Sequence, residues 1–335
     1  MAIIRKSKSS KSETASSRGL ESVVSSSFNC NLLCELCERF FDCSKPEKER
    51  IYSRRRMEQA REALSKIRHK ILVAGGKGGV GKSTCSTNLA IGLAVQKYRT
   101  TILDQDLDGS SIPKMLGVME KKMDIGENGL IPVEGPLGIQ VVAMANLVQK
   151  ERAVVWFHDM RRNASEEFIA HTSYGERDFL VVDLPPGTSS DVVSVLQLIP
   201  DADGMVVVAV PSRVSQMTAR KAILLGKKAG IRLLGVIENM SGYVCECCGF
   251  VDDVFPVGGG YDLAKEQDIP FLGRIPIDGK LARSCDSGKP FVEAFGESAT
   301  AKSIESITKG ILHQISTDRP YGFQEWENQQ EGGQF

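Results

Sequence analysis

The chain has 335 residues, 41% of them apolar, so it can bury a sizeable core in one large domain with a tail. Its 42 basic and 42 acidic side chains cancel, which gives no overall argument for a nucleic-acid or membrane partner. No segment is long and apolar enough to span a bilayer, and no signal-peptide core stands near the start, so we expect neither a membrane span nor secretion.

The first 29 residues are rich in serine and poor in acidic side chains. This composition predicts a solvated, disordered tail over residues 1–29. Transit peptides of organelles have a similar composition, so an organellar address is the alternative.

Four cysteines follow this tail, three of them in the spacing Cys34-x2-Cys37-x5-Cys43, with Cys30 just before. Without a secretory signal, such clustering indicates metal binding in preference to disulfides. Four thiolates from one chain suit a [4Fe-4S] cluster, and they also suit a tetrahedral zinc ion. Residues 47–69 are charged, with apolar side chains at helical spacing, and predict a helix that leads into the first core strand.

Residues 70–317 alternate between short apolar runs and helical segments, which predicts a mostly parallel sheet flanked by helices in an α/β fold. The connections are expected to be right-handed, and ligands to bind at the carboxyl ends of the strands. The predicted strands are 71–74, 101–104, 139–143, 179–183, 205–210 and 233–237. Residues 318–335 are polar and are expected to form a flexible tail.

The run GGKGGVGKST follows the first predicted strand and opens a helical segment. Its pattern Gly-x4-Gly-Lys-Ser in this context predicts a phosphate-binding loop, because backbone N–H groups and a helix N-terminus surround a polyphosphate there. Lys82 would reach the terminal phosphates, and the Ser83 hydroxyl would hold Mg²⁺. The predicted nucleotide-binding residues are Gly75, Gly76, Lys77, Gly78, Gly79, Val80, Gly81, Lys82, Ser83 and Thr84.

Two predicted strands end in carboxylates, with Asp104, Asp106 and Asp108 after one and Asp183 at the end of the other. Phosphoryl transfer to water needs an acid near Mg²⁺ and a carboxylate that positions the attacking water. We interpret Asp108 as a turn residue. Asn239 follows the last predicted strand and is either an adenine-contacting amide or a residue of a turn.

Cys245 and Cys248 form a C-x2-C pair, whose possible uses include a redox pair and half a zinc site. One pair supplies two thiolates, whereas a cubane iron–sulfur cluster needs four. A symmetric dimer supplies four, two from each subunit. Cys247 is a spare thiol between them, and Cys85 and Cys285 are expected to be packed side chains.

The second lysine of the phosphate loop, Lys77, resembles the deviant Walker A signature of the dimerising ATPases, which include nitrogenase iron protein and the septum-site and plasmid-partition ATPases. The resemblance implies that Lys77 contacts nucleotide across a dimer interface and is catalytic together with Lys82 and Asp106. It also implies that Asp106 orients or activates water, that Asp104 supports Mg²⁺, and that Asp183 lies in the outer shell of the metal.

Five further segments resemble the Mrp/Nbp branch of these ATPases, and the match as a whole covers about residues 70–295. The segments are residues 111–117, 183–189, 236–248, 258–260 and 270–278. The resemblance implies an ATP-hydrolysing P-loop scaffold that assembles [4Fe-4S] clusters and passes them to apoproteins. It makes Cys245 and Cys248 the ligands of a cluster that bridges two subunits, with ATP and Mg²⁺ as the other cofactors.

The N-terminal spacing resembles the cytosolic Nbp-type scaffold, which carries a second, stable [4Fe-4S] cluster there. The implied ligands are Cys34, Cys37 and Cys43, with Cys30 as the fourth, although the family places its first cysteine further upstream, where this chain has Leu20. Residues 30–69 are thus expected to form an iron–sulfur extension and linker helix. The implied partners are a second copy, a related ATPase without the N-terminal cysteines, and recipient apoproteins, in the cytoplasm.

Three alternatives remain open from the sequence. One is an organellar iron–sulfur carrier of the same family, which the N-terminal composition allows. A second is a positioning ATPase, which would need a C-terminal amphipathic helix or a basic face to bind membrane or DNA. A third is a reductase that uses its cluster as a redox centre.

Overall fold

The computed structural model describes residues 48–147, 158–245, 248, 250–252, 257–317 and 322–331. The chain divides into two compact units, residues 1–52 and 53–335. The four N-terminal cysteines, the predicted tail over residues 1–29, and Cys247 lie outside the described residues.

Helix α1 (Lys48–Leu64) precedes the first core strand, β1 (Ile67–Gly75). It buries Ala60 and Leu64 against the core. The helix predicted over residues 47–69 is wrong in its last residues, because β1 pairs with its neighbour from Ile67 onward. The backbone hydrogen bonds of this pairing outweigh the helical spacing of the apolar side chains.

One sheet in the described part of the chain has the strand order β10-β9-β8-β1-β7-β2-β6-β5, with β11 also paired to β9. The strands from β9 to β6 run parallel, and β5 and β10 pair antiparallel with their neighbours. All six predicted strands are confirmed. The other strands of this sheet are β2 (Thr100–Asp104), β5 (Val133–Glu134), β6 (Gln140–Val142), β7 (Arg177–Asp183), β8 (Gly204–Ala209), β9 (Leu233–Val244), β10 (Val251–Asp252) and β11 (Phe271–Ile277).

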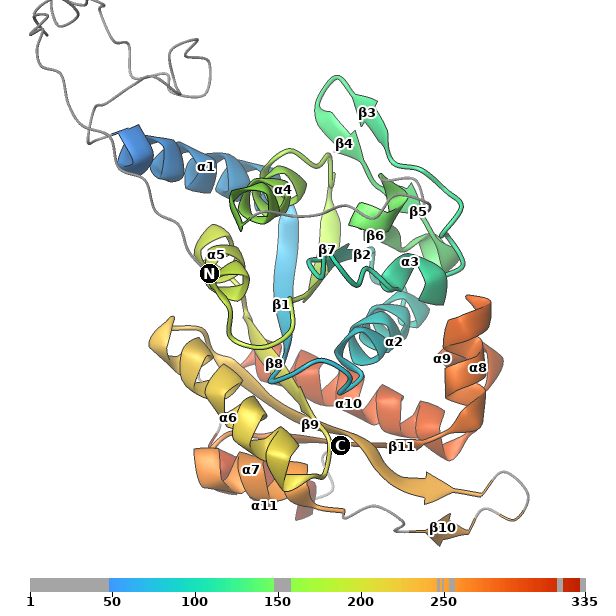
Figure 1. Cartoon of the computed structure of the whole chain (residues 1–335). Helices are drawn as coiled ribbons and strands as arrows, with labels where there is room; N and C mark the ends of the chain where they lie inside the picture. Colours follow the sequence, from blue (N-terminus) through green and yellow to red (C-terminus); the bar gives the residue numbers. More distant parts are fainter. Residues whose placement is uncertain are drawn as a thin grey trace, which may run out of the picture. The chain divides into compact units, whose positions relative to one another are not determined.

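Helices lie on both sides of the sheet, with α2 and α10 on one side in Figure 1 and α5 and α6 on the other. Every residue of β2 and of β8 is buried, as expected for strands covered on both faces. The described helices and the small hairpin strands are α2 (Lys82–Val95), α3 (Ile112–Met115), β3 (Asp124–Gly126), β4 (Gly129–Ile131), η2 (Pro136–Gly138), η3 (Met144–Asn146), α4 (His158–Ala170), α5 (Ser190–Leu198), α6 (Arg213–Lys228), α7 (Gly259–Gln267), α8 (Gly279–Ser287), α9 (Phe291–Ala294), α10 (Ala299–Ser316) and α11 (Phe323–Glu331). None of the described helices is long and apolar enough to cross a bilayer.

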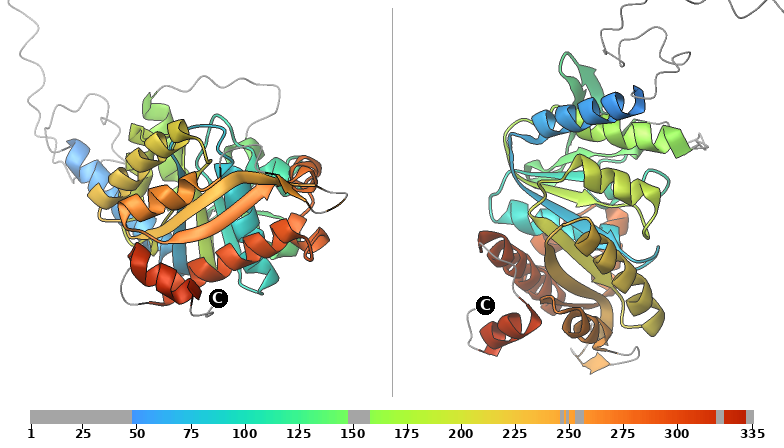
Figure 2. Two further views of the ribbon diagram at one scale, coloured as in Figure 1. Left: turned by 90° about the horizontal axis from the view of Figure 1, so that it is seen from below. Right: turned by 90° about the vertical axis from the view of Figure 1, so that its left-hand side faces the viewer.

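Strand β9 is longer than predicted and contains a bulge. Its pairing with β11 moves from Asn239↔Ile275 to Tyr243↔Ile277, so four steps on β9 match two on β11. Met240 (φ 55°) and Gly242 (φ 71°) take left-handed backbone conformations inside this stretch. Beyond the bulge, β9 continues to its antiparallel pairing with β10. Figure 2 shows the sheet that contains this strand from two further sides. The C-x2-C pair lies between β9 and β10 in the sequence.

Helix α11 lies within the segment that we expected to be a flexible tail. Its Phe323 is buried, and its aromatic side chains contact Tyr261 and Phe271 edge to face. The backbone N–H of Phe323 also donates to the carboxylate of Asp268, at 2.9 Å. Two aromatic residues in an otherwise polar sequence thus hold residues 323–331 against α7 and β11, which corrects the expectation for this part of the tail.

Candidate nucleotide and cluster site

The phosphate loop connects the buried strand β1 to helix α2. The strand ends at Gly75 and the helix begins at Lys82, so the six residues 76–81 place their backbone N–H groups near a helix N-terminus. Gly79 (φ 78°) and Gly81 (φ 81°) have left-handed conformations, which glycine adopts without steric cost. This is the geometry of an anion-binding loop.

Two glycines of the loop are also required by close contacts. A Cβ at Gly76 would lie 2.1 Å from the backbone carbon of Thr218 in α6. A Cβ at Gly81 would lie 2.0 Å from the side-chain nitrogen of Asn239. The loop is therefore held between α6 and β9 at distances that only glycine permits.

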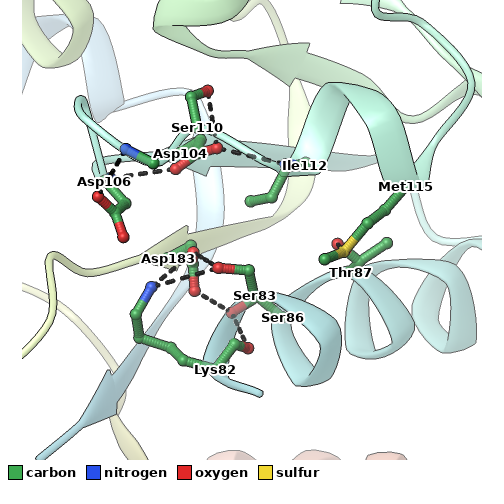
Figure 3. A network of polar contacts seen from close by, with 11 residues as sticks. Lys82, Ser83, Ser86, Thr87, Asp104, Asp106, Ser110, Ile112, Met115 and Asp183 are labelled. Carbon is green, nitrogen blue, oxygen red and sulfur yellow. Dashed lines mark hydrogen bonds and ion pairs between the residues drawn. The ribbon is translucent and has the colours of Figure 1, made fainter. Parts of the chain in front are cut away.

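Asp183 is the centre of the polar network beside the loop (Figure 3). Its carboxylate is fully buried at the end of β7 and forms an ion pair with Lys82 Nζ at 2.7 Å. The hydroxyls of Ser83 and Ser86 each donate to it at 2.6 Å. One carboxylate thus orients both the lysine predicted to bind phosphate and the hydroxyl predicted to hold Mg²⁺.

Asp104 lies beside Asp183 because the two residues are register partners at the ends of β2 and β7. It is buried and accepts hydrogen bonds from the backbone N–H of Asp106 at 3.1 Å and from the hydroxyl of Ser110 at 2.9 Å. Burial and the negative charge of Asp183 raise the pKa of Asp104 to about 7, although Lys82 acts in the opposite direction. A nearby cation would favour the ionised form.

Asp106 and Asp108 lie on the loop after β2. One carboxylate oxygen of Asp106 accepts from the backbone N–H of Gly109 at 3.1 Å, which closes a tight turn. Asp108 is not simply the turn residue that we predicted, because it pairs with Arg161 of α4 at 2.6 Å. The loop after β2 is therefore held in one conformation next to Asp183.

Lys77 and Asn239 differ in how they are held. Lys77 is half-buried in the loop, and within the described ranges no carboxylate or hydrogen-bond acceptor pairs with it. Asn239 is buried within β9, not in a turn, and its amide donates to the carbonyl of Val80 at 2.9 Å. Asn239 thus supports the phosphate loop, and its predicted contact with adenine stays a prediction.

The C-x2-C pair follows β9 at the tip of its hairpin. The backbone N–H of Cys245 donates to the carbonyl of Phe250 at 2.8 Å, which closes the turn. Cys245 is half-buried and Cys248 is exposed, and neither forms a disulfide with a described residue. Among the described residues, no three His, Cys, Asp or Glu side chains are grouped as metal ligands. The pair offers two thiols per chain, and its role as ligands of a bridging cluster stays a prediction.

The other two described cysteines belong to the core: Cys85 lies inside it, and Cys285 packs against its edge. Cys85 is buried in α2, and Cys285 is half-buried in α8. Burial raises the pKa of both thiols, and the negative charge of Asp183 adds to the effect at Cys85. Neither is a group that ionises readily.

Sequence reasoning did not find Ser86, Ser110 or Arg161. Ser86 lies three residues after Ser83 on the same face of α2, and that helical spacing is a signal that could have revealed it. Ser110 and Arg161 reach the acidic residues only through tertiary structure, and no local pattern marks them.

Residues 66–312 match the family described as ParA: NUBPL iron-transfer P-loop NTPase. The chain belongs to this NUBPL-type family of P-loop NTPases.

Relatives of this NUBPL-type chain align along most of its length. The iron-sulfur cluster carrier protein of Methanococcus maripaludis is 37% identical over 290 residues, which are 86% of this chain and 99% of the relative. The cytosolic Fe-S cluster assembly factor nubp2 of Xenopus laevis is 38% identical over 267 residues, 78% of this chain and 99% of the relative. A solved nucleotide-binding protein from Archaeoglobus fulgidus in complex with ADP has a TM-score of 0.62 and 34% identity, over 70% of this chain and 92% of that one.

Proposed function

We propose that this chain is an ATP-dependent scaffold that assembles [4Fe-4S] clusters and transfers them to recipient apoproteins in the cytosol. The observation that carries the proposal is the alignment of its whole NTPase body with proteins named iron–sulfur cluster carriers and cytosolic Fe-S assembly factors. The name of the Xenopus relative supports the cytosol over an organelle.

The residues around the loop suit Mg²⁺ and ATP. Magnesium prefers oxygen ligands and is usually bound by one or two carboxylates or hydroxyls together with phosphates and water. The hydroxyl of Ser83 and the carboxylates of Asp104 and Asp183 provide such oxygens, and the Ser83 hydroxyl is 2.6 Å from Asp183. Ser83 would be the direct ligand, with Asp104 and Asp183 supporting it. When bound, Mg²⁺ would offset the charge of the phosphates.

The proposed reaction is hydrolysis of ATP. Asp106 orients a water whose oxygen bonds to the γ-phosphorus, while the bond from that phosphorus to the β,γ-bridging oxygen breaks and its electron pair leaves with ADP. The proton released by the water passes to Asp106 and then to solvent. Lys82 offsets charge on the phosphates from within the chain, and Lys77, which has no partner among the described residues, would do so from a second subunit.

The cargo is a [4Fe-4S] cluster between two subunits, held by Cys245 and Cys248 of each chain. Each chain has one exposed thiol, Cys248, and one half-buried thiol, Cys245, on the hairpin of β9 and β10, and this placement supports the arrangement. A second, stable cluster is proposed on Cys34, Cys37 and Cys43 with Cys30, all outside the described residues. The second subunit would be another copy or a related ATPase without these N-terminal cysteines.

The alternatives have less support. A positioning ATPase would need an exposed amphipathic helix near its C-terminus, whereas the aromatic side chains of α11 contact Tyr261 and Phe271. A reductase would keep its cluster, while the named relatives are carriers and assembly factors. Transfer of the cluster to an apoenzyme distinguishes a carrier from a reductase.

The test is anaerobic reconstitution of the full chain with iron and sulfide, followed by metal and sulfide analysis. The loaded protein is then mixed with an apoenzyme that regains activity only when it receives a [4Fe-4S] cluster, with and without MgATP. We expect iron and sulfide in equal amounts and recovery of the apoenzyme. Zinc without sulfide, or a cluster that is reduced and oxidised but never transferred, would contradict the proposal. A matched control is Cys285→Ala, which removes a thiol of α8 and should transfer normally.

A further inference from the structure

Arg161 of α4 forms two ion pairs near the nucleotide site, one with Asp108 on the loop after β2 and one with Asp191 in the first turn of α5, which follows the loop after β7. Its Nη2 is 2.6 Å from Asp108 Oδ2, and its Nη1 is 3.6 Å from Asp191 Oδ2. The Arg161 side chain is 35% exposed, that of Asp191 17% and that of Asp108 52%, so the Asp191 end of the bridge is the more buried one. A planar guanidinium suits such a bridge, because its N–H groups point in two directions at once.

The two loops carry the acids of the proposed hydrolysis. Asp108 lies two residues after Asp106, on the loop after β2. Asp191 lies in the first turn of α5, at the end of the loop that begins at Asp183. Because β2 and β7 are neighbours in the sheet, these loops leave it side by side. Without a cation between them, Asp108 and Asp191 would repel each other across the gap.

A pocket of about 410 Å³ lies where the loops and α4 meet, lined by Gln105, Asp106, Ser165 and Pro185 as well as Arg161. Gln105 is 1% exposed, and neither atom of its side-chain amide has a hydrogen-bond partner within the described residues. A buried amide without a protein partner is costly unless a small polar group pairs with it. The two loops are joined where they begin by the backbone hydrogen bond from Gln105 to the carbonyl of Asp183, at 2.9 Å. Further out the pocket lies between them, and Arg161 is the side-chain link between them that we identify.

We propose that Arg161 is a positioning residue for ATP hydrolysis, which holds the Asp106 loop and the Asp183 loop at a fixed separation. It does not touch nucleotide and takes no part in bond making. This inference rests on the proposed ATPase activity and adds a residue to it. Small displacements of a catalytic carboxylate reduce the rate strongly, so a bridge of this kind affects turnover more than binding.

The first test is steady-state ATP hydrolysis. Partly exposed ion pairs contribute up to about 1 kcal/mol, so we expect Arg161→Ala to lower kcat about fivefold, with KM for ATP changed by less than about twofold. Arg161→Lys should give an intermediate rate, because an ammonium group can pair with one carboxylate at a time. Arg162→Ala is the matched control, since Arg162 is the next residue of α4 and pairs with Glu166.

A set of combined variants identifies the bridge as the cause. Asp108→Asn together with Asp191→Asn should lower kcat as much as Arg161→Ala, and adding Arg161→Ala to them should have no further effect, because coupled residues are not additive. Full additivity of the three changes, or a normal kcat in Arg161→Ala, would overturn the proposal.

Hydrogen exchange separates this proposal from the proposed function. In Arg161→Ala, the amides of residues 105–109 and 184–191 should both exchange about fivefold faster than in the unchanged chain, while those of β1 and β8 stay the same. This result is expected even if the chain transfers no cluster. If neither loop exchanges faster, Arg161 does not hold the loops together, whatever the ATPase activity.

Discussion

Lys82 and Asp183 form an ion pair that is almost fully buried, and this makes each of them sensitive to loss of the other. We predict that Lys82→Ala abolishes ATP binding, because no other described cation of the same chain reaches the terminal phosphates. The variant should also be less stable by about 3 kcal/mol, because it leaves a buried carboxylate uncompensated. Titration with a fluorescent ATP analogue and urea denaturation measure the two effects.

A second variant distinguishes a loss of ATP binding from a failure to fold. Lys82→Ala combined with Asp183→Asn removes both charges and should recover much of the stability without recovering ATP binding. Unchanged ATP affinity in either folded variant would contradict the role of Lys82.

The cysteines should differ in their reactivity. The thiolate is the reactive form, and burial raises the pKa of the Cys85 thiol, so Cys85 stays protonated at pH 8 in the folded protein. Cys248 is exposed, so reagent can reach it. We predict that iodoacetamide at about pH 8 modifies Cys248 and spares Cys85 in the native apoprotein. In urea, Cys85 should return to its ordinary pKa and react.

Peptide mass spectrometry with and without urea makes this measurement. Because the thiolate fraction grows as pH rises toward the pKa, raising the pH to about 9 should speed the reaction of exposed thiols but leave native Cys85 unmodified. Rapid modification of Cys85 in the folded protein would show that α2 is not packed as described.

At the scale of elements, α11 is held by a small aromatic cluster. The ring of Phe323 meets that of Tyr261 at 5.1 Å and that of Trp326 at 5.6 Å, and Phe323 is 4% exposed. We predict that Phe323→Ala lowers the free energy of unfolding by about 3 kcal/mol, as buried Phe→Ala changes do. Urea denaturation followed by circular dichroism is the measurement.

The control for this prediction is Gln324→Ala, an exposed position on the same helix, which should change stability by less than about 0.5 kcal/mol. If Phe323→Ala unfolds at the same urea concentration as the unchanged chain, α11 contributes nothing to the fold.

The elements also show what the sequence can and cannot predict. The six predicted strands are buried runs of branched residues, and the phosphate loop has a local pattern that needs no tertiary information. Strand β11 (Phe271–Ile277) was not predicted, since a glycine and a proline interrupt it and its pairing with β9 supplies the missing stability. The predicted end of β9 at residue 237 was wrong because the residues after it suggest a turn, whereas they form a bulge.

The candidate site, too, could be predicted from the sequence only in part. Lys82, Ser83 and Asp183 are each marked by a motif, and the structure brings them within hydrogen-bond distance. The position of Asn239 against Val80, and the bridge made by Arg161, join segments far apart in the chain. No spacing in the sequence encodes such contacts, so they had to come from the fold.

At the scale of the whole molecule, the proposed bridging cluster would link cluster binding to the assembly of two subunits. A cluster that needs four thiolates, on a chain that offers Cys245 and Cys248, couples metal content to the presence of a second subunit. We predict that Cys245→Ala or Cys248→Ala removes the bridging cluster, weakens cluster-dependent dimerisation and abolishes transfer, while ATP binding and the N-terminal cluster persist. Cys247→Ala should have a smaller effect.

Iron per protomer, measured alongside mass in solution, decides between these outcomes. The reconstituted unchanged chain should lose its dimer when the labile iron is chelated, and Cys245→Ala should be monomeric from the start. Full iron content and transfer in Cys245→Ala and Cys248→Ala, with loss of both in Cys247→Ala, would reassign the bridging ligands.

The bulge in β9 lies between Asn239, which contacts the phosphate loop, and the cysteine pair at the end of the strand. Before it, Asn239 is fixed to the carbonyl of Val80, and after it the chain runs on to Cys245. Met240 and Gly242, both left-handed, set the angle at which the hairpin leaves the sheet. In the proposed symmetric dimer, a rotation of one hairpin relative to its sheet would be repeated in the other subunit. The angle between the two cysteine pairs would then change by up to twice as much. A small torsion near the nucleotide would thereby be enlarged at the place where the proposed cluster is held.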